Sequence, residues 1–371
     1  MKYFFVAGEA SGDLHTSTIM KELKGLDPSA TFAFMGGPRM RAVGGRSVVA
    51  SEAIAFMGFV DVALNLSKIQ SAAKRVQQVI LEMQPDVVVC TDYAGFCFRY
   101  ILPFVRKHLP SCRIVYYIPP KVWAWKKGRI KTLRTHTDLV LSIFPFEVPY
   151  FEENHLPQVK YVGNPSLEEV EQFLERHSAT EQAPYIALLP GSRKSEIIKN
   201  LPTMLRVAHA FPEYDIKIAG TDSVPRSLYS EVAPGLEPIF NDTYTILSGA
   251  TAALVTSGTA TLETALFGVP QVVCYAHQAG HLANFVFDRL FTAKYISLVN
   301  LIADEAVVPE LFGGRFREDL IKSELSPLLR ERGDRQHKRE AMIEGYKKVH
   351  RLLQTDAPSS KIAAEAILGQ L

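Results

Sequence analysis

Short apolar runs alternate with longer stretches of helical periodicity along this chain, and the alternation restarts once. Such alternation predicts a mostly parallel β-sheet covered by helices. The first series of predicted strands comprises residues 3–7, 87–90, 114–118, 139–143 and 159–162. The second series comprises residues 185–189, 215–219, 252–256, 271–275 and 296–299. We therefore expect two similar α/β halves, each built on its own sheet.

The length of the chain supports the same division. A chain of 371 residues exceeds what one hydrophobic core normally supports, so two domains are expected. The polar segment 168–182 separates the two series, and charged helical patterns without strands follow from about Arg317. We predict a first domain at 1–165, a second domain at 166–345 and a helical tail at 346–371. The tail either packs back on the first domain or is exchanged in a dimer.

The composition excludes several classes of protein. Hydrophobic residues make up 47% of the chain and charged residues 22%, as in soluble globular proteins, and a net charge of +2 does not imply a polyanionic partner. The four cysteines form no CxxC pair, which favours a reduced compartment. Walker, GxGxxG, HEXXH and EF-hand sequences are missing, so we expect neither a metal nor a cofactor. With no leader and no run of membrane-spanning length, a cytosolic location is expected.

The loops that follow the predicted strands are the places to search for chemistry, because ligands of open parallel sheets bind at the carboxyl ends of the strands. These loops are rich in glycine, proline, hydroxyl groups or charge. They read GEASGD (8–13), TDYAGF (91–96), PPKVWAW (119–125), GNP (163–165), PGSR (190–193), SGTATLE (257–263) and VNLIA (299–303).

The loop PGSR in the second half suits a diphosphate. Gly191 permits close approach of the backbone to a ligand, and Arg193 offers a planar fork of donors for phosphate oxygens. Either Ser192 or Ser195 is able to cap the next helix. The alternative is an ordinary turn with a surface arginine, since short motifs of this kind often occur by chance.

The loop SGTATLE strengthens the diphosphate reading. Ser257, Gly258 and Thr259 would place free backbone N–H groups and hydroxyls at a helix N-terminus, where anions are favoured. Glu263 lies about one turn further on, where a carboxylate is able to accept hydrogen bonds from a ribose diol. The alternative is a helix cap and a first-turn acid that need no ligand.

The loops of the first half present acids to a polyol. Gly8 and Gly12 permit a tight turn, Ser11 is able to cap a helix that starts near Asp13, and the carboxylates of Glu9 and Asp13 are able to accept hydrogen bonds from sugar hydroxyls. Asp92 ends another predicted strand, and a carboxylate there is a candidate general base. Helix capping is the alternative for each acid taken alone.

Five motifs in one order resemble the lipid-A-disaccharide synthase family, from about Phe4 to Leu311. They are GEASGD, PPKVWAWKKGR, LLPGSRKSEI, SGTATLE and SLVNLIADEAVVPEL. The resemblance implies a GT-B glycosyltransferase, that is, two Rossmann-like domains with mostly parallel sheets facing across a cleft. It implies an inverting transfer of 2,3-diacylglucosamine from its UDP donor to the 6-hydroxyl of 2,3-diacylglucosamine 1-phosphate, without metal. It further implies a peripheral protein of the cytoplasmic face of the inner membrane, and a possible homodimer with exchanged C-terminal segments.

The resemblance also assigns roles to residues. Arg193 looks like the diphosphate ligand, and Glu263 and Asn300 look like nucleotide contacts. Asp92 matches an aspartate of the family's DxPDF-type loop, whose second aspartate is Gly95 here. Asp92 and Glu9 are therefore both candidates for the base. The rim of the active site is expected at Glu9, Ser11, Gly12 and Asp13.

Lipid substrates call for a surface that meets acyl chains or a bilayer. The stretch IAFMGFVDVAL (54–64) is unusually apolar, and the segment 121–134 combines six basic residues and two tryptophans with no acid. The alternatives are plain burial, a solvated basic loop, and, less favoured, nucleic-acid binding. The expected membrane or acyl-chain patch comprises Phe56, Met57, Phe59, Val62 and Leu64.

Two rival functions remain at this level. One is another GT-B enzyme on UDP-GlcNAc, either an epimerase or a transferase with a soluble acceptor. The other is a non-catalytic protein that binds a UDP-sugar or a polyanion. Asp92 and Glu9 favour catalysis, because a pure binding protein has no need of a base.

Overall fold

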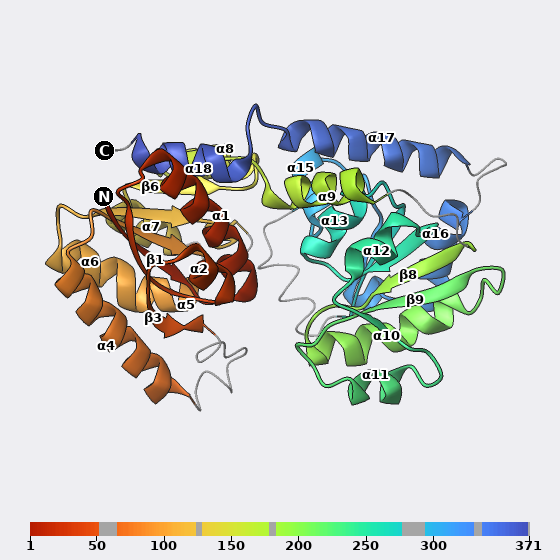
Figure 1. Cartoon of the computed structure of the whole chain (residues 1–371). Coiled ribbons are helices and arrows are strands. Elements are labelled where there is room, and N and C mark those ends of the chain that lie inside the picture. Colours follow the sequence, from red (N-terminus) through yellow and green to blue (C-terminus); the bar gives the residue numbers. More distant parts are fainter. Residues whose placement is uncertain (52–64, 124–127, 178–182, 277–293, 330–335, 370–371) are drawn as a thin grey trace. The chain divides into compact units, whose positions relative to one another are not determined.

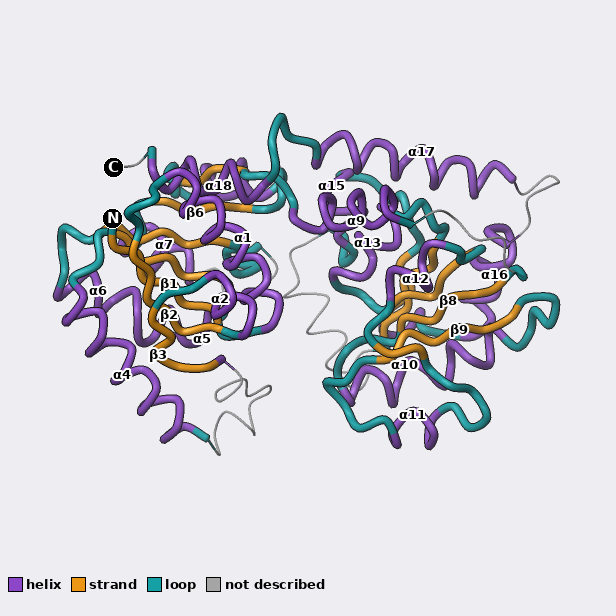
Figure 2. The backbone as a smooth tube through the Cα atoms, viewed as in Figure 1, coloured by secondary structure: helices purple, strands orange, loops and turns teal. Residues whose placement is uncertain are grey.

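The computed structural model describes residues 1–51, 65–123, 128–177, 183–276, 294–329 and 336–369. The chain separates into two compact units (Figure 1). Unit 1 consists of residues 1–165 and 355–371, and unit 2 consists of residues 166–354. In each unit the strands gather into one sheet with helices on both faces (Figure 2), so the predicted two α/β halves are confirmed.

Unit 1 is built on a seven-stranded sheet with the order β3-β2-β1-β4-β5-β6-β7, and its strand pairs are parallel. The order reverses between β1 and β4, which creates a crevice at their carboxyl ends. The strands are β1 (Lys2–Ala7), β2 (Thr31–Gly36), β3 (Arg46–Ala50), β4 (Val87–Thr91), β5 (Arg113–Tyr117), β6 (Leu139–Ser142) and β7 (Val159–Tyr161).

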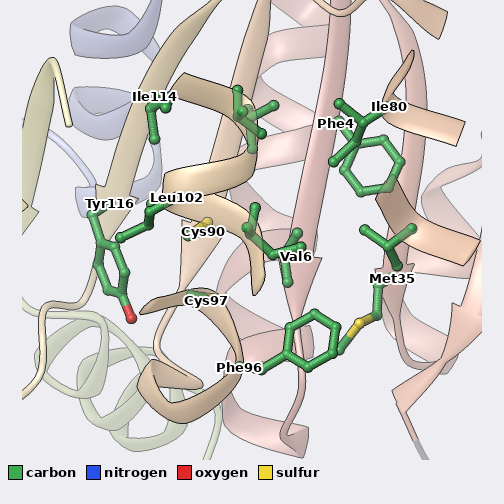
Figure 3. Packing of buried hydrophobic residues seen from close by; sticks show 14 of the residues in the cluster. Phe4, Val6, Met35, Ile80, Cys90, Phe96, Cys97, Leu102, Ile114 and Tyr116 are labelled. Carbon is green, nitrogen blue, oxygen red and sulfur yellow. The ribbon is translucent and has the colours of Figure 1, made fainter. Parts of the chain in front are cut away.

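Helices cover both faces of the unit 1 sheet, because alternate residues of each buried strand point to opposite faces. Phe4 and Val6 pack on one face with residues of α4 and α6 (Figure 3), whereas Tyr3 and Phe5 pack on the other face with α1 and α18. The helices are α1 (Ala10–Leu26), α2 (Pro38–Val43), α4 (Leu66–Met83), α5 (Ala94–Phe96), the π-helical turn η2 (Cys97–Ile101), α6 (Leu102–His108), α7 (Arg129–His136), α8 (Glu147–Glu153) and α18 (Ser359–Leu368).

Unit 2 is built on a six-stranded parallel sheet with the order β10-β9-β8-β11-β12-β13. Here the order reverses between β8 and β11. The strands are β8 (Tyr185–Leu189), β9 (Asp215–Gly220), β10 (Ile239–Phe240), β11 (Ala252–Val255), β12 (Gln271–Tyr275) and β13 (Glu310–Phe312). The helices are α9 (Pro165–Arg176), α10 (Lys194–Ala208), α11 (Ser227–Val232), α12 (Thr243–Ser248), α13 (Thr259–Leu266), α15 (Leu298–Ala303), the short 3-10 helix η3 (Gly313–Arg315), α16 (Glu318–Leu329) and α17 (Gln336–Leu353).

Two details differ from the sequence prediction. The predicted strand at 296–299 is wrong, because Ser297 caps α15 by accepting a hydrogen bond from the backbone of Asn300, and the edge strand is β13 instead. The C-terminal helices also divide between the units. Helix α17 belongs to unit 2, whereas α18 packs on α1 of unit 1 through Ala363 and Ile367.

Candidate active site

The crevice of unit 1 lies where β1 and β4 run side by side, with Ala7 paired to Thr91 at their carboxyl ends. The two following turns touch, since a Cβ atom added to Gly8 would lie only 2.2 Å from Cγ of Tyr93. Glycine is therefore required at position 8. This contact brings the GEASGD and TDYAGF loops together at one edge of the sheet.

Asp92 has an unusual backbone at this crevice. Asp92 and Tyr93 both adopt left-handed conformations, with φ of 48° and 41°, which costs energy in residues other than glycine. Two contacts fix the backbone of Asp92: its N–H donates to the carbonyl of Tyr117 (3.0 Å), and its carbonyl accepts from the hydroxyl of Tyr116 (2.5 Å). A strained turn that is held from both sides is typical of a functional site.

The electrostatic surroundings of Asp92 suit a general base. Burial and, to a smaller extent, the negative charge of Glu9 together raise the pKa of its carboxyl to about 6, against the opposing charge of Lys121. A base is most effective when its pKa lies near the working pH, because it is then deprotonated and still takes up a proton readily. The shifted Asp92 meets this condition better than an ordinary aspartate.

The remaining residues of the GEASGD loop divide into two groups. Glu9 is half-buried, Ser11 is exposed, and α1 begins at Ala10, so Ser11 lies in the first turn and does not cap the helix as predicted. Gly12 and Asp13 are buried. Asp13 is only 2% exposed, and its carboxylate accepts the backbone N–H groups of Gly37 (2.7 Å), Arg39 (2.9 Å) and Met40 (3.1 Å). Asp13 thus holds the N-terminus of α2, and these three donors occupy the oxygens that were expected to meet a sugar.

Glu147 is a buried acid that sequence reasoning did not find. Its carboxyl is 1% exposed and accepts hydrogen bonds from Nε1 of Trp123 (2.9 Å) and Oγ of Ser142 (2.5 Å). Burial raises the pKa of Glu147 to about 7, although both hydrogen bonds and Lys121 lower it. Glu147 therefore holds Trp123 of the loop after β5 in place. The same loop carries Lys121, whose charge lowers the pKa of Asp92.

The crevice of unit 2 places PGSR and SGTATLE at one edge, because β8 and β11 are neighbours with Leu189 paired to Val255. Glu196 organises the first loop: its Oε2 accepts the backbone N–H groups of Ser192 (3.1 Å) and Arg193 (3.3 Å). Gly191 has a φ of 109°, and a Cβ atom there would lie 2.5 Å from Glu196. The glycine thus makes room for the acid.

Arg193 presents most of its guanidinium to solvent. Its Nη1 lies 3.2 Å from Oε1 of Glu196, yet 66% of the side chain is exposed. An exposed ion pair of this kind contributes little to stability. The remaining N–H donors are thus available to an anionic ligand.

The second loop of this edge has a backbone that only glycine adopts easily. Gly258 has φ 149° and ψ −160°, and an added Cβ atom would meet nothing within 4 Å. Ser257 is held because its hydroxyl donates to the carbonyl of Ile296 (3.1 Å), and Thr259 is exposed at the start of α13. The glycine therefore lies beside open space, as expected where a ligand approaches the backbone.

Glu263 lies in a cluster of acids that the sequence did not indicate. The hydroxyl of Tyr244 lies 3.4 Å from Glu263 and 3.4 Å from Glu169 of α9. Burial and the nearby charge of Glu169 together raise the pKa of Glu263 to about 7, although the hydrogen bond from Tyr244 lowers it. The two acids and the tyrosine hydroxyl thus form one polar group in which Glu263 accepts from Tyr244.

Asn300 is occupied by the protein itself. It is 1% exposed, its side-chain amide donates to Val308 O (2.9 Å) and Glu310 (2.9 Å), and its oxygen accepts from Val308 N (2.9 Å). Glu310 also accepts the hydroxyl and backbone N–H of Ser297. The motif SLVNLIADEAVVPEL is thus held by hydrogen bonds among its own residues, and Ile296, which directly precedes it, accepts the hydroxyl of Ser257.

The predicted patch of Phe56, Met57, Phe59, Val62 and Leu64 lies outside the described residues. A cavity of about 690 Å³ lies in unit 2 between the segment 305–309, α16 and α17. This segment leads into the amino end of β13, so the cavity is remote from the carboxyl edge that bears PGSR and SGTATLE. Within the described part of the chain, no helix is long and apolar enough to cross a membrane.

Comparison with solved structures defines the fold class. The structure resembles UDP-GlcNAc 2-epimerase from Neisseria meningitidis, with a TM-score of 0.60, 13% identity and full coverage of both chains. It also resembles the calicheamicin glycosyltransferase CalG4, with a TM-score of 0.60, 14% identity and coverage of 100% of this chain and 98% of the other. Two parallel-sheet units of this kind place the chain in the GT-B fold class of glycosyltransferases and epimerases.

Sequence comparison identifies the family within that class. The family described as lipid-A-disaccharide synthetase matches residues 3–366. A lipid-A-disaccharide synthase of Rhodospirillum centenum is 33% identical over 383 residues, which cover 98% of this chain and 93% of that protein. One of Geobacter sulfurreducens is 35% identical over 342 residues, which cover 88% of each chain. The chain therefore belongs to the lipid-A-disaccharide synthase family of glycosyltransferases.

Proposed function

We propose that the protein transfers 2,3-diacylglucosamine from its UDP donor to the 6-hydroxyl of 2,3-diacylglucosamine 1-phosphate. The acceptor oxygen forms a bond to the anomeric carbon, the bond from that carbon to UDP breaks, and the configuration inverts. The hydroxyl proton passes to a base of the protein, and UDP leaves with the bonding electron pair. The products are the β-1,6-linked disaccharide 1-phosphate and UDP.

The carboxyl group of Asp92 carries this proposal. It lies at the reversal point of a parallel sheet, in a left-handed turn, with a pKa of about 6. We assign to Asp92 the removal of the proton from the acceptor hydroxyl, and to Glu9 the charge that keeps Asp92 basic. Because Gly95 replaces the second aspartate of the family's loop, Asp92 bears this role without a partner from its own loop.

Unit 2 supplies the donor site in this proposal. The exposed guanidinium of Arg193 and the backbone N–H groups of Ser257 to Thr259 stabilise the charge that develops on the departing diphosphate. Glu263 accepts hydrogen bonds from the ribose diol, with Tyr244 beside it. Ser11 of unit 1, exposed beside Glu9, is assigned to the acceptor sugar.

Membrane association is a second part of the proposal. Acyl-chain substrates and the basic residues Lys121, Arg129, Lys131 and Arg134 favour a peripheral protein on the cytoplasmic face of the inner membrane. Co-sedimentation with anionic vesicles tests this, with neutral vesicles as the control. Equal sedimentation with both, or none with either, contradicts it.

A homodimer is also proposed, formed by exchange of the C-terminal segment. Helix α18 packs on α1 through a short connection after α17, so exchange would replace these contacts by the same contacts from a second copy. Light scattering gives the mass directly. A monomer of 41.3 kDa at all concentrations contradicts the dimer.

The reaction itself is tested by incubating the purified chain with both diacyl substrates and following UDP release together with disaccharide. UDP-GlcNAc replaces the donor in a parallel reaction. We expect disaccharide only with the diacylated donor. UDP release or epimerisation from UDP-GlcNAc without an acceptor favours the rival GT-B functions instead.

A further inference from the structure

Asn200 is a buried side-chain amide in α10, and its surroundings are unusual. It is 0% exposed, and both its polar atoms have partners. The amide nitrogen donates to the carbonyl of Pro190 (3.2 Å) and to Oγ1 of Thr256 (2.9 Å). The amide oxygen accepts the backbone N–H of Ala276 (2.9 Å).

These three partners belong to three different loops. Pro190 follows β8 and directly precedes Gly191, Thr256 follows β11 and directly precedes Ser257, and Ala276 follows β12. One side chain thus joins the carboxyl ends of three neighbouring strands. The loop after β9 is tied to the same edge separately, because the hydroxyl of Ser223 donates to the carbonyl of Ser192 (2.6 Å).

The chemistry of the contact requires an amide. Two acceptors and one donor converge on position 200, and only a group with two N–H bonds and a carbonyl satisfies all of them. Leucine has nearly the same volume but forms no hydrogen bonds. It would leave buried polar groups of three loops without partners, which costs more than the bonds themselves contribute.

We propose that Asn200 is a positioning residue for the donor diphosphate. It sets the spacing between Arg193 on one loop and the Ser257 to Thr259 amides on the next, although it does not touch the ligand itself. This inference rests on the proposed donor site in unit 2. Small displacements of such groups weaken binding and transfer strongly, because charged contacts to a diphosphate depend on accurate geometry.

A purely structural role makes a different prediction. If Asn200 only stabilises the fold, its loss lowers the melting temperature and leaves the kinetics of the folded fraction unchanged. A positioning role raises the dissociation constant of UDP and the KM of the donor. The KM of the acceptor stays unchanged in both cases.

The test compares three variants of the full chain. Asn200→Leu removes all three contacts, and Thr256→Val removes one of them with almost no change in shape. Tyr185→Phe is the matched control. It deletes a buried hydrogen bond from Tyr185 to Ile246 O (2.8 Å) at the first residue of β8, the opposite end of the strand that precedes Gly191.

Calorimetric titration with UDP, donor and acceptor KM values and thermal melting are measured for each variant. We expect the dissociation constant of UDP to rise about tenfold or more in Asn200→Leu and about threefold in Thr256→Val. Tyr185→Phe should lower the melting temperature without changing UDP affinity. If Asn200→Leu does not fold, Thr256→Val decides the question alone.

The inference is overturned if Thr256→Val and Asn200→Leu, where folded, bind UDP as tightly as the unmodified chain. It is also overturned if the acceptor KM rises as much as the donor KM. Failure of the proposed function has another signature: the unmodified chain then binds no UDP, or releases none in the presence of both substrates.

Discussion

Each of the two units contains its own parallel sheet, but the residues at the carboxyl edges of the two sheets differ in chemistry. In unit 1 the edge presents an acid: Asp92 is held in a strained turn, and burial together with Glu9 raises its pKa to about 6. In unit 2 the edge presents donors: Arg193 is 66% exposed, and Gly258 opens the backbone toward free space. The edge of unit 1 is therefore suited to accept a proton, whereas the edge of unit 2 is suited to bind an anion.

The way each edge is held differs as well. Asp92 is fixed mainly by backbone groups and by the hydroxyl of Tyr116. The loops of unit 2 are fixed by side chains: Glu196 holds the backbone of its own loop, and Asn200 reaches the ends of three strands. Similarity of fold alone therefore does not assign chemistry, because the residues at the edge of the sheet decide which group meets the substrate.

The largest expected effect follows from removing the acid of unit 1. Asp92→Asn keeps the shape of the side chain but cannot take up the acceptor proton, so kcat should fall about 1,000-fold. The affinity for UDP should not change, since that site belongs to unit 2. Asp86→Asn is the control, because Asp86 lies at the opposite end of β4 and accepts the backbone N–H of Lys2 (2.8 Å). Equal losses in the two variants would contradict the comparison.

Removing the cation of unit 2 should have the next largest effect. Arg193→Ala deletes a charged contact to the leaving group, which we expect to raise the barrier by about 2 kcal/mol and to weaken UDP binding. Arg206→Ala is the control. It removes an arginine at the other end of α10, 56% exposed, that pairs with Glu318 at 2.5 Å. Turnover of Arg193→Ala close to that of the control would refute the assignment.

The buried acid Glu147 gives a prediction about stability. Its pKa is raised to about 7 in the folded protein, so it binds a proton more tightly when folded than when unfolded. Its contribution to stability is complete below the unfolded pKa of about 4.5 and is lost as the pH rises through about 7. Between pH 8 and pH 5, the unmodified chain should gain about 2 kcal/mol relative to Glu147→Gln.

Thermal melting of both proteins across this pH range measures the difference. A difference that is independent of pH would show that Glu147 is not a protonated buried acid near neutrality. Comparison with Glu147→Gln cancels the contribution of the other acids of the chain, which titrate in both proteins.

The smallest expected effect concerns the influence of Glu9 on Asp92. The negative charge of Glu9 raises the pKa of Asp92, so Glu9→Gln should lower that pKa and move the acid limb of kcat/KM to lower pH. The pH profile of the variant measures this shift. A shift to higher pH would mean that Glu9 does not act on Asp92 through its charge.

The sequence predicted the central architecture because buried parallel strands are continuous apolar runs, as in 87–91 and 185–189. It missed β2, whose residues include alanine, methionine and glycine, which favour strands weakly, and β3, which lies at the sheet edge and is partly exposed. The segment 296–299 was wrongly predicted as a strand, because a short apolar run does not distinguish a strand from a helix. In the structure Ser297 caps the N-terminus of α15, which stabilises the helical conformation of the residues that follow.

The candidate site was predictable only in part. The positions of Asp92, Arg193 and Gly258 follow from strand ends, which the sequence reveals. The engagement of Asp13 with residues 37–40 does not, because those partners lie 24 to 27 residues away. Asn200 contacts Thr256 across 56 residues and Ala276 across 76, so no local pattern indicates it. Roles that depend on such long-range contacts require the fold.

The central claim is that a carboxyl of unit 1 with a raised pKa takes the acceptor proton. The pH dependence of kcat/KM for the acceptor, measured between pH 4.5 and pH 8, tests it most directly. Because the base acts only when deprotonated, kcat/KM should be constant above about pH 7 and should fall about tenfold per unit below the Asp92 pKa of about 6. A profile that stays constant down to pH 5 would contradict the claim.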